Sequence, residues 1–226
     1  MIIAIDGPSG AGKSTVAKAV AKRLGFNCLD TGAMFRAVAW QALEDGASLD
    51  DAEALGAIAR THPVSFTHEP GDPSPAQVLM DGVDVTSAIR TARIDRSVSA
   101  VSAHPSVRAA LLDQQRRIAS EGDYVIEGRD IGTVVFPNAD VKVFLTASDE
   151  ARARRRAAQN EVRGIGSTDL AEALVDIRMR DEADESRAAA PLVQADDAVA
   201  VDSSDISVDE VIDRICALAA ERGSKA

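Results

Sequence analysis

The segment Ile5-Asp6-Gly7-Pro8-Ser9-Gly10-Ala11-Gly12-Lys13-Ser14 decides the fold of this 226-residue chain. From Gly7 to Ser14 it matches the pattern G-x-x-x-x-G-K-S/T in full. The apolar run Met1–Ile5 precedes it, and apolar residues at helical spacing follow it from Val16 to Leu24. The order strand, loop, helix is the context in which this pattern forms a phosphate-binding P-loop.

The residues of this loop are suited to hold a polyphosphate. Glycines let consecutive backbone N–H groups turn inward around a phosphate, and the N-terminus of the following helix adds a favourable dipole. Lys13 brings positive charge to the β- and γ-phosphates, and the Ser14 hydroxyl is a ligand for the Mg²⁺ that bridges them. We therefore expect ATP and Mg²⁺ to be bound, with Ser14 as the metal ligand, by Gly7, Pro8, Ser9, Gly10, Ala11, Gly12, Lys13, Ser14 and Thr15.

Four more apolar runs predict further strands of one sheet. Each is short and continuous in apolar residues, as strands buried on both faces are. They are Phe26–Leu29, Tyr124–Glu127, Val141–Leu145 and Ala198–Val201. Helical patterns separate or follow them at Gly32–Leu43, Ser106–Ser120 and Val208–Arg222, with long charged helical stretches before Ala198. The fold expected is α/β, with about five parallel strands and helices on both faces.

One segment departs from this alternation. From His62 to about Arg90 the chain is rich in proline and carries two short β-like pieces, Val64–Thr67 and Gln77–Met80. Asp81-Gly82 is typical of a tight turn, and we expect it to join such pieces. The pattern predicts a small antiparallel insertion in the parallel fold.

Composition limits the classes of function. The formal net charge of −11 argues against a nucleic-acid groove, so phosphate chemistry must depend on local positive charge. Arginines do cluster, at 152–156 and again at 178–187, although such a run is also typical of a solvated helix face. Cys28 and Cys216 lie far apart without metal-ligand spacing, and the three histidines are scattered.

No apolar stretch approaches the roughly 20 residues of a membrane span, and Met1 leads within five residues to an aspartate rather than into a signal peptide. We expect a cytoplasmic monomer that binds neither nucleic acid nor membrane.

A P-loop alone does not separate kinases from GTPases, motors or switches. The chain has no N-K-x-D motif for guanine, and it is short for a motor. A kinase for a small acceptor needs an acceptor pocket and mobile arginines, and no dedicated base where the acceptor's own phosphate oxygen attacks. From these residues the acceptor stays open among UMP, AMP, shikimate, pantoate and similar molecules. A nucleotide-binding switch without turnover is the alternative from another class.

Four segments together resemble the signature segments of the bacterial cytidylate kinases, in order and spacing. They are Ile5 to Ser14, Leu29-Asp30-Thr31-Gly32-Ala33-Met34-Phe35-Arg36, Glu127-Gly128-Arg129-Asp130-Ile131-Gly132-Thr133-Val134-Val135-Phe136-Pro137 and Arg187-Ala188-Ala189-Ala190-Pro191-Leu192. The resemblance runs through nearly the whole chain, including Asp84-Val85-Thr86 and Ile89-Arg90 in the insertion. It implies an enzyme of pyrimidine nucleotide metabolism that transfers the γ-phosphate of ATP to CMP or dCMP.

The resemblance also implies the organisation of one P-loop NTPase domain spanning 1–226. Its core comprises about 1–31, 121–150 and 191–226. An insertion of about 32–120, with small antiparallel strands, would bind the nucleoside monophosphate. A short lid of about 150–190 would close over the substrates.

The family's phosphate-binding residues carry over onto arginines of this chain. The resemblance implies that Arg36 and Arg129 hold the α-phosphate of the acceptor, a role suited to a planar guanidinium. It assigns lid arginines to the transferring phosphoryl group, namely Arg152, Arg155 and Arg156. Lys13, Arg129 and Arg180 complete the catalytic set.

The rest of the implied acceptor site surrounds the nucleoside. Thr31, Ser99, Arg108 and Asp130 would surround the cytosine, while Arg180 and Asp184 lie near the ribose and Arg187 orders the site. A guanidinium can satisfy the O2 and N3 acceptors of cytosine, and a carboxylate can accept from its 4-amino group. Uracil inverts this pattern and would leave buried partners unpaired.

Two positions near the acceptor depart from the family or have two interpretations. Phe35 stands where a tyrosine is common, so a hydroxyl is missing, while Thr31 keeps the hydroxyl of the serine also found there. Asp30 fits a site residue or a helix cap equally well. The sequence does not distinguish a preference for CMP from one for dCMP.

Overall fold

The computed structural model describes residues 1–69 and 71–224, so Pro70 of the expected insertion and the last two residues lie outside it. A five-stranded parallel sheet forms the centre, in the order β2-β6-β1-β7-β8. The strands are β1 (Ile2–Asp6), β2 (Asn27–Asp30), β6 (Tyr124–Glu127), β7 (Val141–Thr146) and β8 (Val199–Asp202). Each predicted strand is confirmed to within one or two residues.

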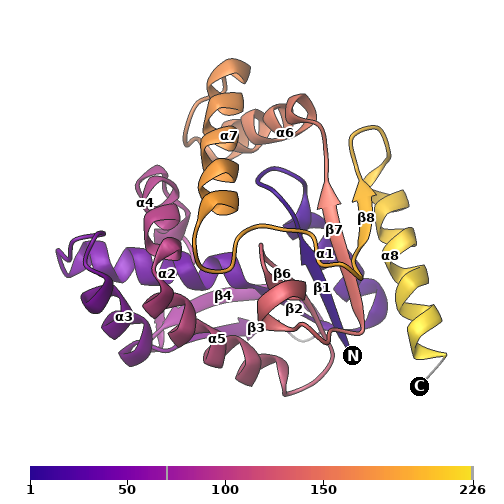
Figure 1. Ribbon diagram of the computed structural model, residues 1–226, viewed down its shortest axis with the longest axis horizontal. Coiled ribbons are helices and arrows are strands. Elements are labelled where there is room, and N and C mark those ends of the chain that lie inside the picture. The colour runs from indigo at the N-terminus through magenta and orange to yellow at the C-terminus, as the bar shows by residue number, and fades with distance from the viewer. Residues whose placement is uncertain (70, 225–226) are drawn as a thin grey trace.

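Helices cover both faces of the sheet, as predicted (Figure 1). Ile3 and Ile5 of β1 pack with α1 (Lys13–Leu24) and α8 (Val208–Gly223). Ala4 points to the opposite face, toward α2 (Thr31–Glu44) and α5 (Pro105–Ala119). This alternation follows from the two-residue period of a strand, and it explains why the strand is apolar at every position.

The parallel register brings polar strand ends to one edge of the sheet. Ile5 lies opposite Glu127, and Asp30 lies opposite Glu127 on the other side. The P-loop therefore begins beside the ends of β2 and β6. In open parallel sheets this carboxyl edge is where ligands bind.

The insertion combines the predicted hairpin with helices that the sequence did not reveal. A three-stranded antiparallel sheet contains β3 (Val64–His68), β4 (Pro75–Met80) and β5 (Val83–Asp84). Asp81 and Gly82 link the last two strands with φ of 51° and 79°, as a tight two-residue hairpin turn requires. The unexpected helices are α3 (Ala52–Thr61), α4 (Ala92–Ala103) and the short turn η1 (Ala88–Arg90).

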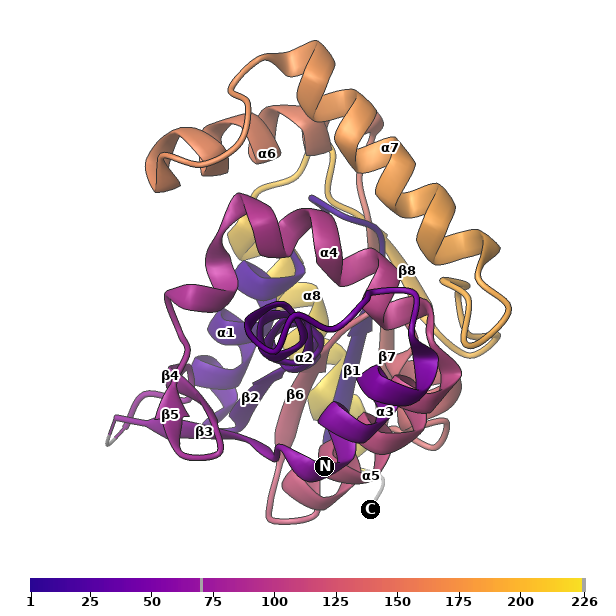
Figure 2. The ribbon, with the colours of Figure 1, turned by 90° about the vertical axis from the view of Figure 1, so that its left-hand side faces the viewer.

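Two charged helices, α6 (Asp149–Arg163) and α7 (Leu170–Ser186), pack together above the carboxyl edge of the sheet (Figure 2). Ala153, Ala157, Ala173 and Ile177 form their small shared core. The structure thus confirms that the arginine-rich run lies on a helix. Among the described residues, no helix is both long and apolar enough to cross a bilayer.

Gly7 links β1 to the P-loop at a position where no other residue fits. Its φ is 148°, and a Cβ there would lie 2.0 Å from the carbonyl oxygen of Leu145 in β7. We expect Gly7→Ala to lower the free energy of unfolding by at least about 3 kcal/mol, from backbone strain and overlap together. Urea denaturation followed by circular dichroism measures the change.

Gly46→Ala is the matched control, because Gly46 also has positive φ (67°) but an added Cβ would meet nothing within 4 Å. Its loss should be about 1 kcal/mol. Equal losses in the two variants would show that the contact with Leu145 is unimportant.

Candidate active site

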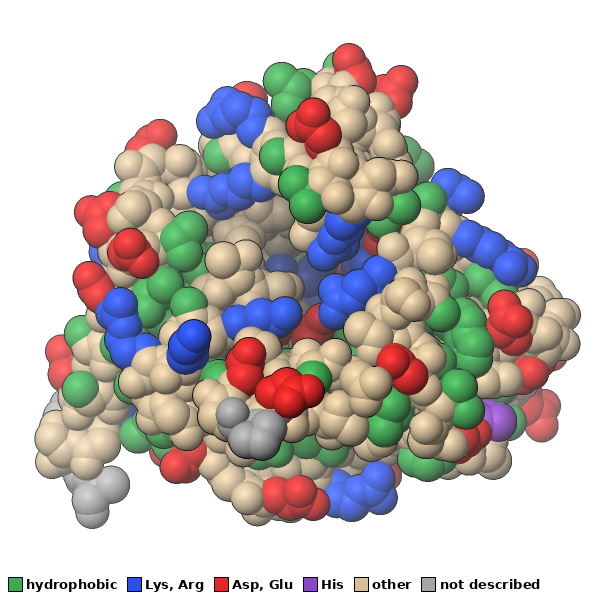
Figure 3. Space-filling model, turned by 180° about the vertical axis from the view of Figure 1, so that it is seen from behind, with side chains coloured by type: hydrophobic (Ala, Val, Ile, Leu, Met, Phe, Trp, Pro, Cys, Tyr) green, Lys and Arg blue, Asp and Glu red, His purple; other side chains and the backbone are tan. Residues whose placement is uncertain are grey.

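A cavity of about 490 Å³ opens at the carboxyl edge of the sheet, between the P-loop, the insertion and α6 and α7. Seen from behind, Lys and Arg side chains gather around this hollow (Figure 3). Nine arginines and Lys13 line it, against four acidic side chains. In a chain of net charge −11, this concentration of positive charge marks a site for an anionic ligand. The arginines are Arg36, Arg90, Arg108, Arg129, Arg155, Arg156, Arg163, Arg180 and Arg187.

The P-loop presents backbone donors and one lysine to this cavity. Helix α1 begins after Gly12 without a side-chain cap, so its first N–H groups are available to a ligand. Lys13 is buried, and its Nζ donates to the carbonyl oxygen of Pro8 at 2.8 Å. Burial, together with the nearby Arg129, lowers the pKa of Lys13. An anion at this point would stabilise the charged ammonium.

Glu127, at the end of β6, is a site residue that sequence reasoning missed. It is buried in the cavity wall, and its Oε1 has no hydrogen-bond partner among the described residues. Burial and the neighbouring Asp30 raise the pKa of Glu127, while Lys13 and the Ser14 hydroxyl act to lower it. A carboxylate closing an otherwise apolar strand was the signal that could have found it.

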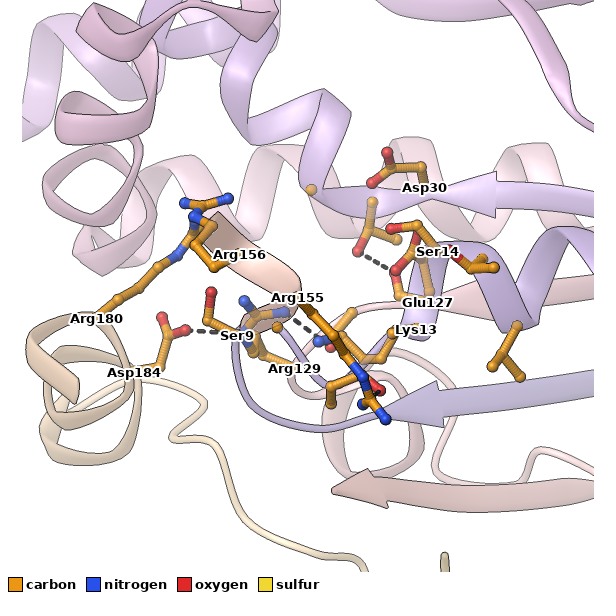
Figure 4. A pocket seen from close by; sticks show the side chains of 18 of the residues that line it. Ser9, Lys13, Ser14, Asp30, Glu127, Arg129, Arg155, Arg156, Arg180 and Asp184 are labelled. Carbon is orange, nitrogen blue, oxygen red and sulfur yellow. Dashed lines mark hydrogen bonds and ion pairs between the residues drawn. The ribbon is translucent and has the colours of Figure 1, made fainter. Parts of the chain in front are cut away.

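Asp184 is one of two carboxylates that hold arginines in position beside the P-loop. Asp184 accepts from Arg129 Nε at 2.8 Å and from Arg187 at 3.3 Å. Burial alone would raise the pKa of Asp184, but Arg129 and Arg180 outweigh it and lower the pKa. Figure 4 shows Asp184 bound to Arg129, with Arg180 and Arg156 approaching the side that carries Lys13, Ser14 and Glu127.

Asp130 joins the same network from the loop after β6. It forms an ion pair with Arg108 and a longer contact of 3.6 Å with Arg187. The Arg108 guanidinium also lies over the Phe35 ring, 5.1 Å from its centroid. Phe35 therefore supports this arginine through its π face, for which no hydroxyl is needed.

Other cavity arginines have fewer partners. Arg36 is paired with Asp95 at 2.5 Å and donates to the carbonyl of Ile89 at 3.3 Å. Within residues 1–69 and 71–224, the side chains of Arg90, Arg163 and Arg180 form no hydrogen bond or ion pair. Burial, with Arg129 and Arg36 nearby, lowers the pKa of Arg180 to about 9. It is thus still cationic at neutral pH, and a bound anion would relieve the repulsion.

The structure brings most predicted site residues into one wall. Ser9, Gly10, Ala11, Gly12, Lys13, Ser14, Thr15, Thr31, Arg36, Arg108, Arg129, Asp130, Arg155, Arg156, Arg180, Asp184 and Arg187 all line the cavity. Asp30 lines it too and also caps α2, since its Oδ1 accepts from Ala33 N at 3.0 Å. Asp30 is therefore a helix cap that also lies at the cavity.

Four predicted residues do not line the cavity. Gly7 packs on Leu145, and Pro8 contributes the carbonyl that Lys13 binds. Ser99 lies on α4 outside the wall, to which the same helix supplies Val98 and Ser102. Arg152 is buried beneath the P-loop, with its guanidinium occupied by protein groups.

On the side opposite Asp130 and Asp184, the cavity extends into an arm near β8. Arg155 bridges this arm to the P-loop, donating to the carbonyls of Ser203 at 2.6 Å and Ala11 at 3.3 Å. The apolar residues Ile206, Val208 and Val211 line it. An aliphatic wall with one guanidinium suits a flat aromatic base.

Asp6 connects the P-loop to the loop that follows β6, and sequence reasoning missed this residue as well. Its two carboxylate oxygens accept from Ile131 N at 2.8 Å and Gly132 N at 2.7 Å. These amides begin the π-helical turn Ile131–Val135, directly after Arg129 and Asp130. The residue preceding the P-loop therefore fixes the loop that carries two acceptor-side groups.

Comparisons with known proteins identify the family of this chain. A family model for cytidylate kinase matches residues 3–221. The cytidylate kinase of Rhodococcus opacus (strain B4) is 49% identical over 98% of this chain and 96% of its own length. That of Desulfitobacterium hafniense (strain Y51) is 46% identical over 96% and 91%, and that of Saccharophagus degradans is 46% identical over 98% of both chains.

Asp6 should make stability depend on pH. Burial raises its pKa from an ordinary 3.8 to about 6, so the folded state binds the proton more tightly than the unfolded state. Its contribution is therefore fully present below about pH 4 and is lost as pH rises through 6. The unfolding free energy of the wild type, minus that of Asp6→Asn, should fall by about 3 kcal/mol over this range.

Urea denaturation of both proteins between pH 4 and pH 7 measures this difference. Because the asparagine amide in the variant cannot titrate, subtraction removes the contributions of all other groups. A difference that stays constant with pH would contradict the raised pKa of Asp6.

Proposed function

The chain belongs to the cytidylate kinase family, and we propose that the arginine-lined cavity is the active site of this kinase. The enzyme transfers the γ-phosphate of ATP to CMP or dCMP, giving ADP and CDP or dCDP. One observation carries the assignment of the site: a P-loop and nine arginines face the same enclosed volume. The triphosphate of ATP and the single phosphate of CMP can be held there with their charges screened.

ATP, the phosphate donor, would lie along the P-loop. The free N–H groups of the first turn of α1 and the Lys13 ammonium suit its β- and γ-phosphates. The adenine would occupy the arm beside Ile206 and Val208, and Arg155 would lie between the adenine and the phosphates. This assignment leaves the acceptor side to the arginines held by Asp130 and Asp184.

Mg²⁺ fits beside Ser14 and Glu127. The unpartnered buried oxygen of Glu127 is a hard anionic ligand, and the Ser14 hydroxyl lies next to it. Among the described residues, no group of three or more His, Cys, Asp or Glu could hold a metal alone. Mg²⁺ would therefore bind through Ser14, Glu127, water and the nucleotide phosphates, and when bound it would neutralise phosphate charge.

The acceptor phosphate would bind Arg36 and Arg129. Each is already oriented by a carboxylate, Asp95 and Asp184 respectively, which leaves other guanidinium nitrogens for the phosphate. Thr31, Arg108 and Asp130 would read the cytosine, with Ser99 as a more distant contact from α4. Arg180, Asp184 and Arg187 would lie against the ribose and complete the site.

Transfer then needs positioning more than acid–base chemistry. An oxygen of the CMP phosphate attacks the γ-phosphorus, and the bond from that phosphorus to the bridging oxygen breaks with its electron pair left on ADP. Lys13, Arg129, Arg155, Arg156 and Arg180 would stabilise the negative charge during transfer. Arg152 contributes from outside the cavity, as argued below.

The remaining proposals concern the whole molecule. Residues of about 32–120 would act as the acceptor-binding insertion and about 150–190 as the lid, moving against the core to exclude water. A monomer would suffice, because one chain supplies both sides of the cavity. The free thiols of Cys28 and Cys216 suit the reducing cytoplasm.

Acceptor-dependent ADP release tests the assigned site. With ATP and Mg²⁺, turnover should be highest with CMP and dCMP in a panel that includes UMP, AMP and shikimate. Lys13→Ala should lower kcat by about 10³-fold, because a charge stabiliser of the transferring group is lost. Lys22→Ala, exposed on the same helix, is the matched control and should retain activity. Full activity of Lys13→Ala would remove the P-loop from the active site.

Glu127→Gln tests the metal site while preserving side-chain volume. We expect the Mg²⁺ concentration for half-maximal activity to rise about tenfold, because a charged oxygen ligand is lost. Chelation of Mg²⁺ should abolish ADP release from both proteins. Glu150→Gln, at an exposed position, is the control. An unchanged Mg²⁺ requirement in Glu127→Gln would exclude Glu127 from the metal site.

A further inference from the structure

Arg152 and Asp181 enclose one residue of the P-loop from outside the cavity. The Ser9 N–H donates to Asp181 Oδ1 at 2.8 Å, and Arg152 donates to the Ser9 carbonyl oxygen at 2.9 Å. Arg152 and Asp181 also form an ion pair with each other. The exposed fractions of Ser9, Arg152 and Asp181 are only 4%, 6% and 7%. We call these three residues the Ser9 clamp.

Every nitrogen of the Arg152 guanidinium already donates to a protein acceptor. Its Nε donates to the carbonyl of Ala147 at 3.2 Å, and its other terminal nitrogen pairs with Asp149 at 2.5 Å. The opposite charges outweigh burial and raise the pKa of Arg152, so it stays cationic. The contacts to Ser9 and Asp181 occupy the third nitrogen. Arg152 therefore differs from Arg155 and Arg156, which reach the cavity.

The clamp joins three segments that carry the active site. Arg152 lies in the first turn of α6, Asp181 lies in α7, and Ser9 lies in the P-loop. The contact is close, since a Cβ on Gly10 would lie 3.0 Å from the carbonyl oxygen of Arg152. Because side chains one helical turn apart share a face, fixing Arg152 also fixes Arg156, and fixing Asp181 fixes Asp184.

We propose that Arg152 and Asp181 are positioning residues, which hold both polar groups of the Ser9 backbone and thereby align the lid arginines with the P-loop. The proposal rests on the phosphotransfer assigned to this cavity. It predicts an effect on kcat, because a small misplacement of charged groups weakens stabilisation of the transferring phosphoryl group. Binding of CMP should change less than kcat, since Arg36, Arg108 and Asp130 lie on other segments and only the contacts through Asp184 depend on α7.

A double-mutant cycle with Arg152→Met and Asp181→Leu tests the proposal. Each single variant should lower kcat about 10²-fold, with a smaller change in KM for CMP. The double variant should be no slower than either single one, because one clamp is lost in every case. Arg154→Met and Asp176→Leu, both exposed on the same helices, should keep wild-type kcat.

Stability separates positioning from a merely structural role. Arg152→Met leaves the buried Asp181 without its ion pair, and Asp181→Leu leaves Arg152 with Asp149 as its remaining carboxylate partner. The midpoint of urea denaturation should therefore fall in each single variant, whereas the double variant should regain much of the loss. The kcat of the double variant should stay low, because the Ser9 N–H and carbonyl still lack partners. Hydrogen exchange at the Ser9 amide, measured without nucleotide, should quicken in Asp181→Leu and in the double variant even if the phosphotransfer assignment were wrong.

Three results would overturn the proposal. Loss of activity in Arg152→Met alone, with Asp181→Leu active, would make Arg152 a direct contact of the phosphoryl group. Losses that multiply in the double variant would mean that the residues act independently. Recovery of kcat together with stability in the double variant would reduce the pair to a structural role.

Discussion

Positive charge must be held in a partly dehydrated cavity before any substrate arrives, and the rest of the structure follows from this constraint. Nine arginines and a lysine share a volume of about 490 Å³ with four carboxylates. Positive charges confined to this volume repel one another strongly, because little water is present to screen them. The lowered pKa of Arg180, near 9, expresses that repulsion together with burial. Ion pairs with carboxylates that the fold holds fixed keep several of these arginines in position despite the repulsion.

Carboxylates in and beside the cavity separate six of its arginines into two groups. Asp95, Asp130 and Asp184 orient Arg36, Arg108 and Arg129, so the acceptor side is arranged in advance. Arg90, Arg163 and Arg180 form no such pair in the described part of the chain. The first group gives geometric selectivity, since its orientation costs little upon binding. The second group keeps its full attraction for anions.

The sequence was sufficient for features that depend on neighbours along the chain. The P-loop, the five strands and the Asp81-Gly82 turn each follow from local pattern and backbone preference. Helix α4 was missed because its sequence, ARIDRSVSAVSA, is rich in serine and weak in helix propensity, and tertiary packing of Ile94 and Val101 stabilises it. The matched segments led to most of the cavity wall, since whole motifs carry their site residues with them.

The sequence did not reveal which residues matter through partners that lie far away along the chain. Asp6 binds amides 125 and 126 positions away, and Asp181 binds Ser9 across 172 positions. Arg152 shows the consequence most clearly, because it belongs to the same arginine run as Arg155 and Arg156. Composition makes the three equivalent, but only Arg152 meets a buried carboxylate on α7. In such a run, the residues that surround each arginine determine whether its guanidinium faces the cavity or binds other groups of the protein.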